Sequence, residues 1–151
     1  MKAVVQRVIE ASVTVDGVTK GRIGFGLLVY LGVAHDDTTN EADWLAEKII
    51  NLRIFNDSEG KMNLSLVDIV NQDIGILAVS QFTLLGDARK GRRPSWGKAA
   101  PPEKAKDLYG YFIEKIRETG LLCESGEFQA HMKVTYTNDG PVTIILDTEN
   151  I

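Results

Sequence analysis

The stretch MKVTYTNDGPVTIILD (residues 132–147) contains the pattern that decides the fold class. Two runs rich in β-branched residues flank Asn138-Asp139-Gly140, a sequence typical of a tight turn between antiparallel strands. Pro141 follows directly, and a proline cannot donate a hydrogen bond to a neighbouring strand. The stretch therefore predicts either an ordinary hairpin turn or a rigid piece of backbone that has a role of its own.

Strand-like runs also occupy much of the remaining chain. Asp16-Gly17 is a second hairpin signal, because both residue types suit the central positions of a two-residue turn. The apolar run 24–34 is too short and too rich in glycine for a long helix, so we interpret it as a central strand. The predicted strands are residues 3–8, 11–17, 24–34, 74–85, 121–124, 131–136 and 142–147.

Two segments show the periodicity of amphipathic helices. Residues 38–53 begin with Thr38 and Glu41, which have the spacing of a capping box, and carry apolar residues at helical intervals. Pro101 and Pro102 open the second helix, since proline suits a first turn, and Gly120 ends it. The apolar face of the second helix consists of Ala105, Leu108, Tyr109, Phe112, Ile113 and Ile116.

The order of these elements predicts the α+β class, because strands, helix, strands, helix and strands follow one another with hairpin turns. We expect a curled, barrel-like and mainly antiparallel β-sheet with the two long helices packed against it. The chain of 151 residues has the length of one domain and shows no linker or repeat. Residues 1–151 are therefore interpreted as a single domain.

Composition argues against several classes of protein. No run reaches the roughly 18 apolar residues of a membrane span, and Gln6 and Arg7 interrupt the N-terminal run, unlike a signal peptide. The single cysteine, Cys123, permits no internal disulfide, which is typical of a reducing cytoplasm. The net charge of −4 argues against general coating of nucleic acid but is compatible with a local basic site.

Residues for nucleophilic or metal catalysis are sparse. Cys123 would need a base, but His35 and His131 are distant from it in sequence, and a cysteine among apolar residues is usually a buried hydrophobe. No serine lies in a Gly-x-Ser-x-Gly turn, and no histidine pair has metal-ligand spacing. We therefore expect no metal and no other cofactor.

A basic loop stands out against the acidic composition. The segment ARKGRRPSWGK (residues 88–98) contains 5 of the 17 basic residues and no acid. Arginine forks suit phosphate groups and a tryptophan can stack on a base, so the loop predicts RNA contact, with a solvated loop as the alternative. Its residues of interest are Arg89, Lys90, Arg92, Arg93, Trp96 and Lys98.

The motif Ser80-Gln81-Phe82-Thr83 ends a strongly apolar predicted strand. If strand alternation continues, Ser80 and Phe82 face one side and the other two residues face the opposite side, so the four side chains cannot converge. Either the strand twists here or its terminal backbone N–H groups form part of a site. Losing one such donor costs about 2.7–4 kcal/mol of transition-state stabilisation in known oxyanion sites. The alternative is a strand that ends in an ordinary loop.

Over essentially its whole length the chain resembles the D-aminoacyl-tRNA deacylase family. The motifs Ser80–Thr83 and NDGPVT (residues 138–143) are specific to that family, and AVVQRVIEASVTVDG, GFGLLVYLGV, RIFNDSEGKMNLS, AVSQFTLL and GRRPS follow its order. The resemblance implies a cytoplasmic homodimer that hydrolyses the ester between a D-amino acid, or mischarged glycine, and the terminal ribose of tRNA, without a required metal. It implies the aminoacylated 3′ end of tRNA as partner, and neither a membrane nor DNA.

The resemblance also implies how chirality is read. The Gly140-Pro141 peptide would be cis and would reach into the pocket of the partner subunit. There its carbonyl groups would grip the α-amino group and block an L side chain. Met132 would help to close the pocket. Asn138, which lies in the same segment as Gly140 and Pro141, would also serve substrate binding and chiral selectivity. Both enantiomers carry the same groups, so exclusion by a stiff element is a physically reasonable way to distinguish them.

Ser80, Gln81, Phe82 and Thr83 are implied to be the catalytic motif. Their backbone would line the ester, and the region of Phe82 would hold the terminal adenosine. The neighbouring ribose hydroxyl can activate water or stabilise the developing charge, so the protein would supply positioning and backbone donors rather than a strong base. Thr83 as a nucleophile is the alternative, although no general base stands beside it in sequence.

Three rival interpretations stay open. The first is an esterase for a small ester substrate that depends on Thr83 or Cys123. The second is an RNA-binding dimer that uses the basic loop and catalyses no reaction. The third is a structural dimer in which residues 138–141 form an inert turn. Some residues also depart from the family's usual pattern and leave the shape of the pocket open. These residues are Gln129, His131 and Trp96.

Overall fold

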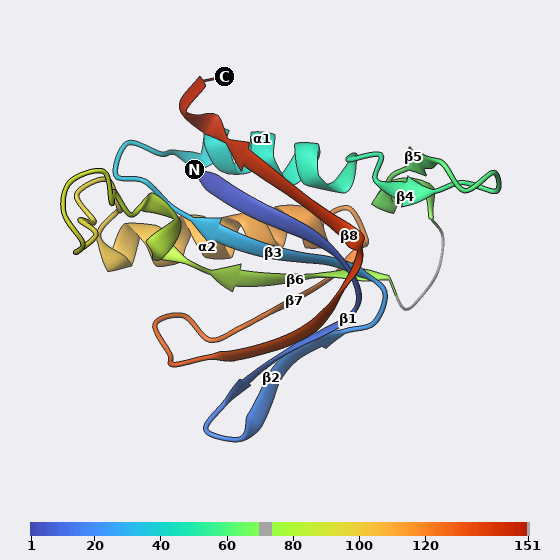
Figure 1. Ribbon diagram of the computed structural model, residues 1–151, viewed down its shortest axis with the longest axis horizontal. Coiled ribbons are helices and arrows are strands. Elements are labelled where there is room, and N and C mark those ends of the chain that lie inside the picture. The colour runs from blue at the N-terminus through green and yellow to red at the C-terminus, as the bar shows by residue number, and fades with distance from the viewer. Residues whose placement is uncertain (70–73, 151) are drawn as a thin grey trace.

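Eight strands and two long helices make up the computed structural model, which describes residues 1–69 and 74–150 (Figure 1). The elements are β1 (Lys2–Val15), β2 (Val18–Ile23), β3 (Gly26–Gly32), α1 (Thr39–Ile50), β4 (Phe55–Asn56), β5 (Met62–Leu64), η1 (Leu66–Asp68), β6 (Gly75–Ser80), η2 (Phe82–Leu85), α2 (Pro102–Arg117), β7 (Leu122–Ser125), β8 (Lys133–Asp147) and η3 (Thr148–Asn150). No helix in these described ranges is long and apolar enough to cross a bilayer.

The main sheet has the order β2-β1-β3-β6-β7, and β8 pairs with the other edge of β1. The predicted α+β class, the curled sheet and the two helices are confirmed. The sheet is mainly antiparallel, as predicted, because β1 is antiparallel to β2, β3 and β8, but β6 runs parallel to both β3 and β7. The reason is that α1 lies between β3 and β6, and α2 between β6 and β7, as crossover connections between parallel strands require.

The sheet curls until β2 lies against β7, and this closes most of a barrel. The two strands approach closely at Gly21, where a Cβ atom would lie 2.5 Å from the carbonyl oxygen of Ser125. The predicted turn at Asp16-Gly17 joins β1 and β2, and both residues have positive φ angles, as a primed turn requires.

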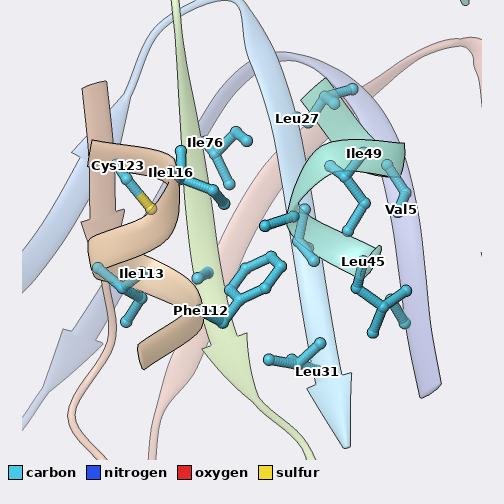
Figure 2. Close-up of a cluster of buried hydrophobic side chains, with 14 of the residues drawn as sticks. Val5, Leu27, Leu31, Leu45, Ile49, Ile76, Phe112, Ile113, Ile116 and Cys123 are labelled. Atoms are coloured by element: carbon cyan, nitrogen blue, oxygen red, sulfur yellow. The ribbon is translucent and has the colours of Figure 1, made fainter. Parts of the chain in front are cut away.

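Both helices cover one face of the sheet, and the main core lies between these layers (Figure 2). Phe112 of α2 is fully buried there, so its truncation to alanine would cost about 3–5 kcal/mol. The side chains labelled in Figure 2 come from β1, β3, β6, β7 and both helices: Val5, Leu27, Leu31, Leu45, Ile49, Ile76, Phe112, Ile113, Ile116 and Cys123. A second cluster fills the curl on the opposite face: Val8, Ala11, Val13, Ile23, Leu28, Leu77 and Val79.

The predicted capping box of α1 is confirmed. The Thr38 backbone N–H donates to Glu41 at 2.6 Å, and the Thr38 hydroxyl accepts from the Asn40 N–H at 3.2 Å. Hydrogen bonds from Thr38 lower the pKa of Glu41 from its ordinary value of 4.5. The helix ends at Ile50, three residues earlier than the periodicity predicted, with Asn51 as its C-cap.

The predicted strand over residues 74–85 is too long. β6 ends at Ser80, and the following residues form the short 3₁₀ helix η2. The Gln81 N–H still donates to Leu31 at 2.8 Å, but Leu85 then turns back and packs on Gly32, where a Cβ atom would lie 2.5 Å from its Cδ2. Leu84 and Leu85 extended the predicted strand because they are apolar, but Leu85 is buried by its tertiary contact with Gly32 and not as part of a strand.

The two strands predicted over residues 131–136 and 142–147 are a single strand, β8. No hairpin separates them, because the long strand β1 pairs with both halves. The register breaks between the pairs Gln6–Thr143 and Val8–Asn138, so the chain between them bulges out of the ladder. The Gly140-Pro141 peptide is cis, and Gly140 has φ +118°. The bulge explains how β8 accommodates a proline, since Pro141 needs no ladder hydrogen bond there.

Candidate active site

A cavity of about 580 Å³ opens where β6 ends and α2 begins. Its size lies within the range of pockets for small molecules. Most of its wall is apolar, and a few polar groups from η2 and from the segment before β8 reach it. The lining residues are Val33, Val79, Ser80, Gln81, Phe82, Ala99, Ala100, Pro102, Ala105, Phe128, Gln129, Ala130, His131, Met132 and Val134.

Three residues of the signature motif lie at this cavity. Ser80, Gln81 and Phe82 line it, whereas Thr83 is exposed and does not. The Gln81 side-chain amide donates a hydrogen bond to the Thr83 hydroxyl. The turn from β6 into η2 thus brings Gln81 to the cavity beside Ser80 and Phe82, although strand alternation placed it on the opposite face. Phe82, the first residue of η2, has a backbone N–H without a partner inside that helix and lies at the cavity.

The wall formed by residues 126–132 is held from several elements. The Gly126 N–H and the Tyr109 hydroxyl both donate to the Ala78 carbonyl, at 3.1 and 2.9 Å. The rings of Tyr109 and Phe128 pack with centroids 6.1 Å apart. Burial raises the pKa of Tyr109 from 10.0 to about 12, so its hydroxyl keeps its proton to a higher pH than an exposed tyrosine does. Met132, predicted to help close the pocket, packs against Gly126 and lines the cavity.

An exposed aromatic pair adjoins the cavity, because Phe82 lines it and Trp96 packs on Phe82. The rings of Phe82 and Trp96 meet edge to face, with centroids 5.3 Å apart at 69°. Phe82 is 53% exposed and Trp96 is 41% exposed, which leaves aromatic surface open to a ligand. Trp96 also packs on Gly86, where a Cβ atom would lie 2.6 Å from its ring. The structure therefore joins the basic loop to the signature motif, which the sequence could not place together.

The charges of the basic loop are partly neutralised. Arg89 forms an ion pair with Asp87 at 2.5 Å, and its hydrogen bonds hold the pKa of that carboxyl well below its usual range. Lys98 pairs with Glu149 at 2.5 Å. The remaining loop residues, Lys90, Arg92 and Arg93, are exposed and form no ion pair within residues 1–69 and 74–150. These three positive charges are available to a polyanion.

The NDGP segment does not line this cavity in its own chain. Asn138 fixes the two ends of this bulge, because its side-chain amide donates to the carbonyls of Arg7 at 2.9 Å and of Val142 at 3.1 Å. Asp139 lies 2.9 Å from the Nε atom of Arg7, which is 6% exposed. Sequence reasoning missed Arg7, although a charged residue in phase with the buried Ala3 and Val5 was an available signal.

The position of Cys123 does not suit a nucleophile. Cys123 is buried in the main core, and burial raises the pKa of its thiol to about 12. His131 lines the cavity, while His35 lies apart and pairs with Asp36. No cluster of three or more potential metal ligands occurs in the part of the chain that the structure describes.

A nearly closed mixed sheet with two helices on one face defines a class of small α+β domains. Comparison identifies the family within it. Residues 4–147 match the family model described as D-Tyr-tRNA(Tyr) deacylase. A D-aminoacyl-tRNA deacylase of Geotalea uraniireducens (strain Rf4) is 62% identical over 148 residues, covering 98% of this chain and 94% of that protein. One from Thermotoga petrophila is 56% identical over 151 residues, covering 100% and 99%.

Two solved structures agree with this fold. The first, described as a c-Myc DNA Unwinding Element Binding Protein, has a TM-score of 0.89 and 45% identity and covers 98% of this chain and 99% of its own. The second, a probable eukaryotic D-amino acid tRNA deacylase, has a TM-score of 0.79 at 20% identity, covering 96% and 97%, and supports the fold alone. The chain belongs to the D-aminoacyl-tRNA deacylase family and is a hydrolase of that enzyme class.

Proposed function

We propose that the protein hydrolyses the ester that joins a D-amino acid, or mischarged glycine, to the terminal ribose of tRNA. The observation that carries this proposal is the position of Ser80, Gln81 and Phe82, which line a cavity of about 580 Å³ in a member of this family. A cavity of this volume suits an aminoacylated nucleoside. The exposed Phe82 ring offers a stacking surface for the terminal adenosine.

The reaction is attack of water on the ester carbonyl, followed by loss of the ribose oxygen, which leaves with a proton. The adjacent ribose hydroxyl of the substrate assists this proton transfer. The backbone N–H groups at the start of η2 stabilise the negative charge that develops on the carbonyl oxygen. This division of work fits a site in which the Thr83 hydroxyl accepts a hydrogen bond from Gln81, because an amide donor cannot act as its general base.

Chiral selectivity comes from the Gly140-Pro141 segment of a second subunit. Within one chain this segment lies away from the cavity, so it can act on the ester only from a partner. The carbonyls of both residues grip the α-ammonium group, and the stiff backbone excludes an L side chain. The surface of β8 supports a homodimer, since Ile145 is 74% exposed and Tyr136 is 36% exposed on this edge strand.

The basic loop binds the tRNA backbone near its 3′ end. Lys90, Arg92 and Arg93 supply positive charges that form no ion pair in the part of the chain that the structure describes, and Trp96 connects the loop to Phe82. This local site lets an acidic protein bind RNA, and a soluble aminoacyl-tRNA as substrate places the protein in the cytoplasm.

The test is release of the amino acid from three substrates: D-Tyr-tRNA, L-Tyr-tRNA and D-Tyr-tRNA with a 2′-deoxy terminal adenosine. We expect fast release from the first alone, and little from the deoxy form. Release that survives the deoxy sugar would instead indicate a protein nucleophile, with Thr83 as the first candidate. Binding of all three without release would leave an RNA-binding protein and overturn the proposal.

A further inference from the structure

Arg7 is a buried arginine at an inward-facing position of β1. Ala3 and Val5, the preceding residues in the same phase, are fully buried in the main core. Arg7 itself is only 6% exposed. A guanidinium in such a place destabilises the fold unless its donors and its charge are matched. Its surroundings therefore need a full account.

The Arg7 side chain joins two separate parts of the fold. On one side, its Nη1 atom donates to the Ile54 carbonyl at 2.6 Å and to the Asn56 Oδ1 atom at 3.3 Å. These acceptors belong to the short β4–β5 arm, which lies at one end of the molecule, opposite the basic loop (Figure 1). On the other side, its Nε atom lies 2.9 Å from Asp139.

The contact with Asp139 does not orient the guanidinium by itself. The Nε atom is buried and has no hydrogen-bond acceptor among the described residues, so this is an ion pair without a directed hydrogen bond. The directed bonds are those that Nη1 makes to the arm. The orientation of the fork is therefore set from the β4–β5 side.

The fork is in close contact with the selectivity segment. A Cβ atom on Gly140 would lie 3.0 Å from the Arg7 Nη2 atom and 2.8 Å from Val142. The backbone at Gly140 thus packs against the guanidinium so closely that a side chain larger than that of glycine would clash. A rotation of the fork would move this backbone or leave it unsupported.

We propose that Asn56 is a positioning residue that acts through Arg7 on the Gly140-Pro141 segment. The inference rests on the proposed function of that segment in excluding L side chains. Asn56 supplies the one side-chain acceptor that Arg7 has on the arm within the described residues, and the Ile54 carbonyl supplies the backbone acceptor. Selectivity by exclusion requires the excluding backbone to be held to a fraction of an ångström, so loss of the Asn56 acceptor relaxes it.

The test compares three variants with the wild type. Asn56→Ala removes the acceptor, and Asn56→Asp retains an Oδ1 acceptor. Asn63→Ala is the matched control, because Asn63 lies on the same arm but accepts from Arg53. The readout is the ratio of kcat/KM for D-Tyr-tRNA to that for L-Tyr-tRNA, with the melting temperature of each variant measured in parallel.

We expect Asn56→Ala to lower the ratio about three- to tenfold, as the loss of one hydrogen bond to a charged group permits, through faster hydrolysis of the L ester. Asn56→Asp restores the ratio, and Asn63→Ala leaves it unchanged. A wild-type ratio in Asn56→Ala overturns the inference, and so does an equal fall in Asn63→Ala, which would indicate a general effect of the arm. A wild-type enzyme without D over L preference would instead overturn the proposed function itself.

Discussion

Gly32→Ala should lower both the stability and the proposed deacylase activity, because η2 packs against the sheet at Gly32. A Cβ atom at this position would lie 2.5 Å from the Leu85 Cδ2 atom, 3.0 Å from the Gln81 carbonyl oxygen and 3.2 Å from the Leu84 Cβ atom. The Leu85 side chain is buried and cannot move freely into solvent. One extra methyl group in a packed site of this kind costs about 1–3 kcal/mol.

The same methyl group pushes η2 away from β3 and displaces the residues beside the cavity. We expect a melting temperature lower by about 2–12 °C for a chain of this length. Misplacement of catalytic groups by about 1 Å costs up to about 100-fold, so kcat/KM for D-Tyr-tRNA should fall at least tenfold. Circular dichroism melting and single-turnover deacylation measure the two effects.

Gly97→Ala is the matched control. This glycine lies in the basic loop, and a Cβ atom there would have no neighbour within 4 Å. Its melting temperature and kcat/KM should remain those of the wild type. If Gly32→Ala also keeps both wild-type values, the reasoning that η2 is positioned by contact with Gly32 is wrong.

Three further predictions concern the reaction, the alkaline stability and the binding of tRNA. Thr83→Val should keep kcat within about threefold if Thr83 is not a nucleophile, whereas a loss beyond about 1,000-fold in single-turnover assays would identify it as one. Burial raises the pKa of Cys123 from 9.0, and that of Tyr109 from 10.0, to about 12, so the unfolded state loses these protons at lower pH than the folded state does. Urea denaturation should therefore show a free energy of unfolding that falls from about pH 9 towards pH 12, and Cys123→Ala should reduce that fall. An equal fall in Cys123→Ala would mean that the thiol is already ionised in the folded state. The double variant Arg92→Ala, Arg93→Ala should make the slope of log affinity against log salt shallower by about 1.4 in tRNA titrations, and an unchanged slope would place the phosphate contacts elsewhere.

The predicted residues that line the cavity are those with a local signal in the sequence. Ser80, Gln81 and Phe82 end an apolar run and form a recognisable motif. Three of the five charges of the basic loop form no ion pair with the described residues, which is typical of an isolated loop. The pairing of Arg89 with Asp87 and the contact of Trp96 with Phe82 depend on how the loop folds back, which no spacing in the sequence records.

The sequence by itself determined the helices, most strand positions and the α+β class, because periodicity, capping residues and turn residues act over a few neighbours. Only the tertiary structure decided that β6 runs parallel to β3, since a crossover helix rather than a turn sets that direction. Only the structure decided that residues 132–147 form one strand with a bulge, because the length of β1 lets both halves pair with a single partner. The tertiary structure likewise decided that Arg7 contacts Gly140, since the burial of a charge depends on partners distant in the chain.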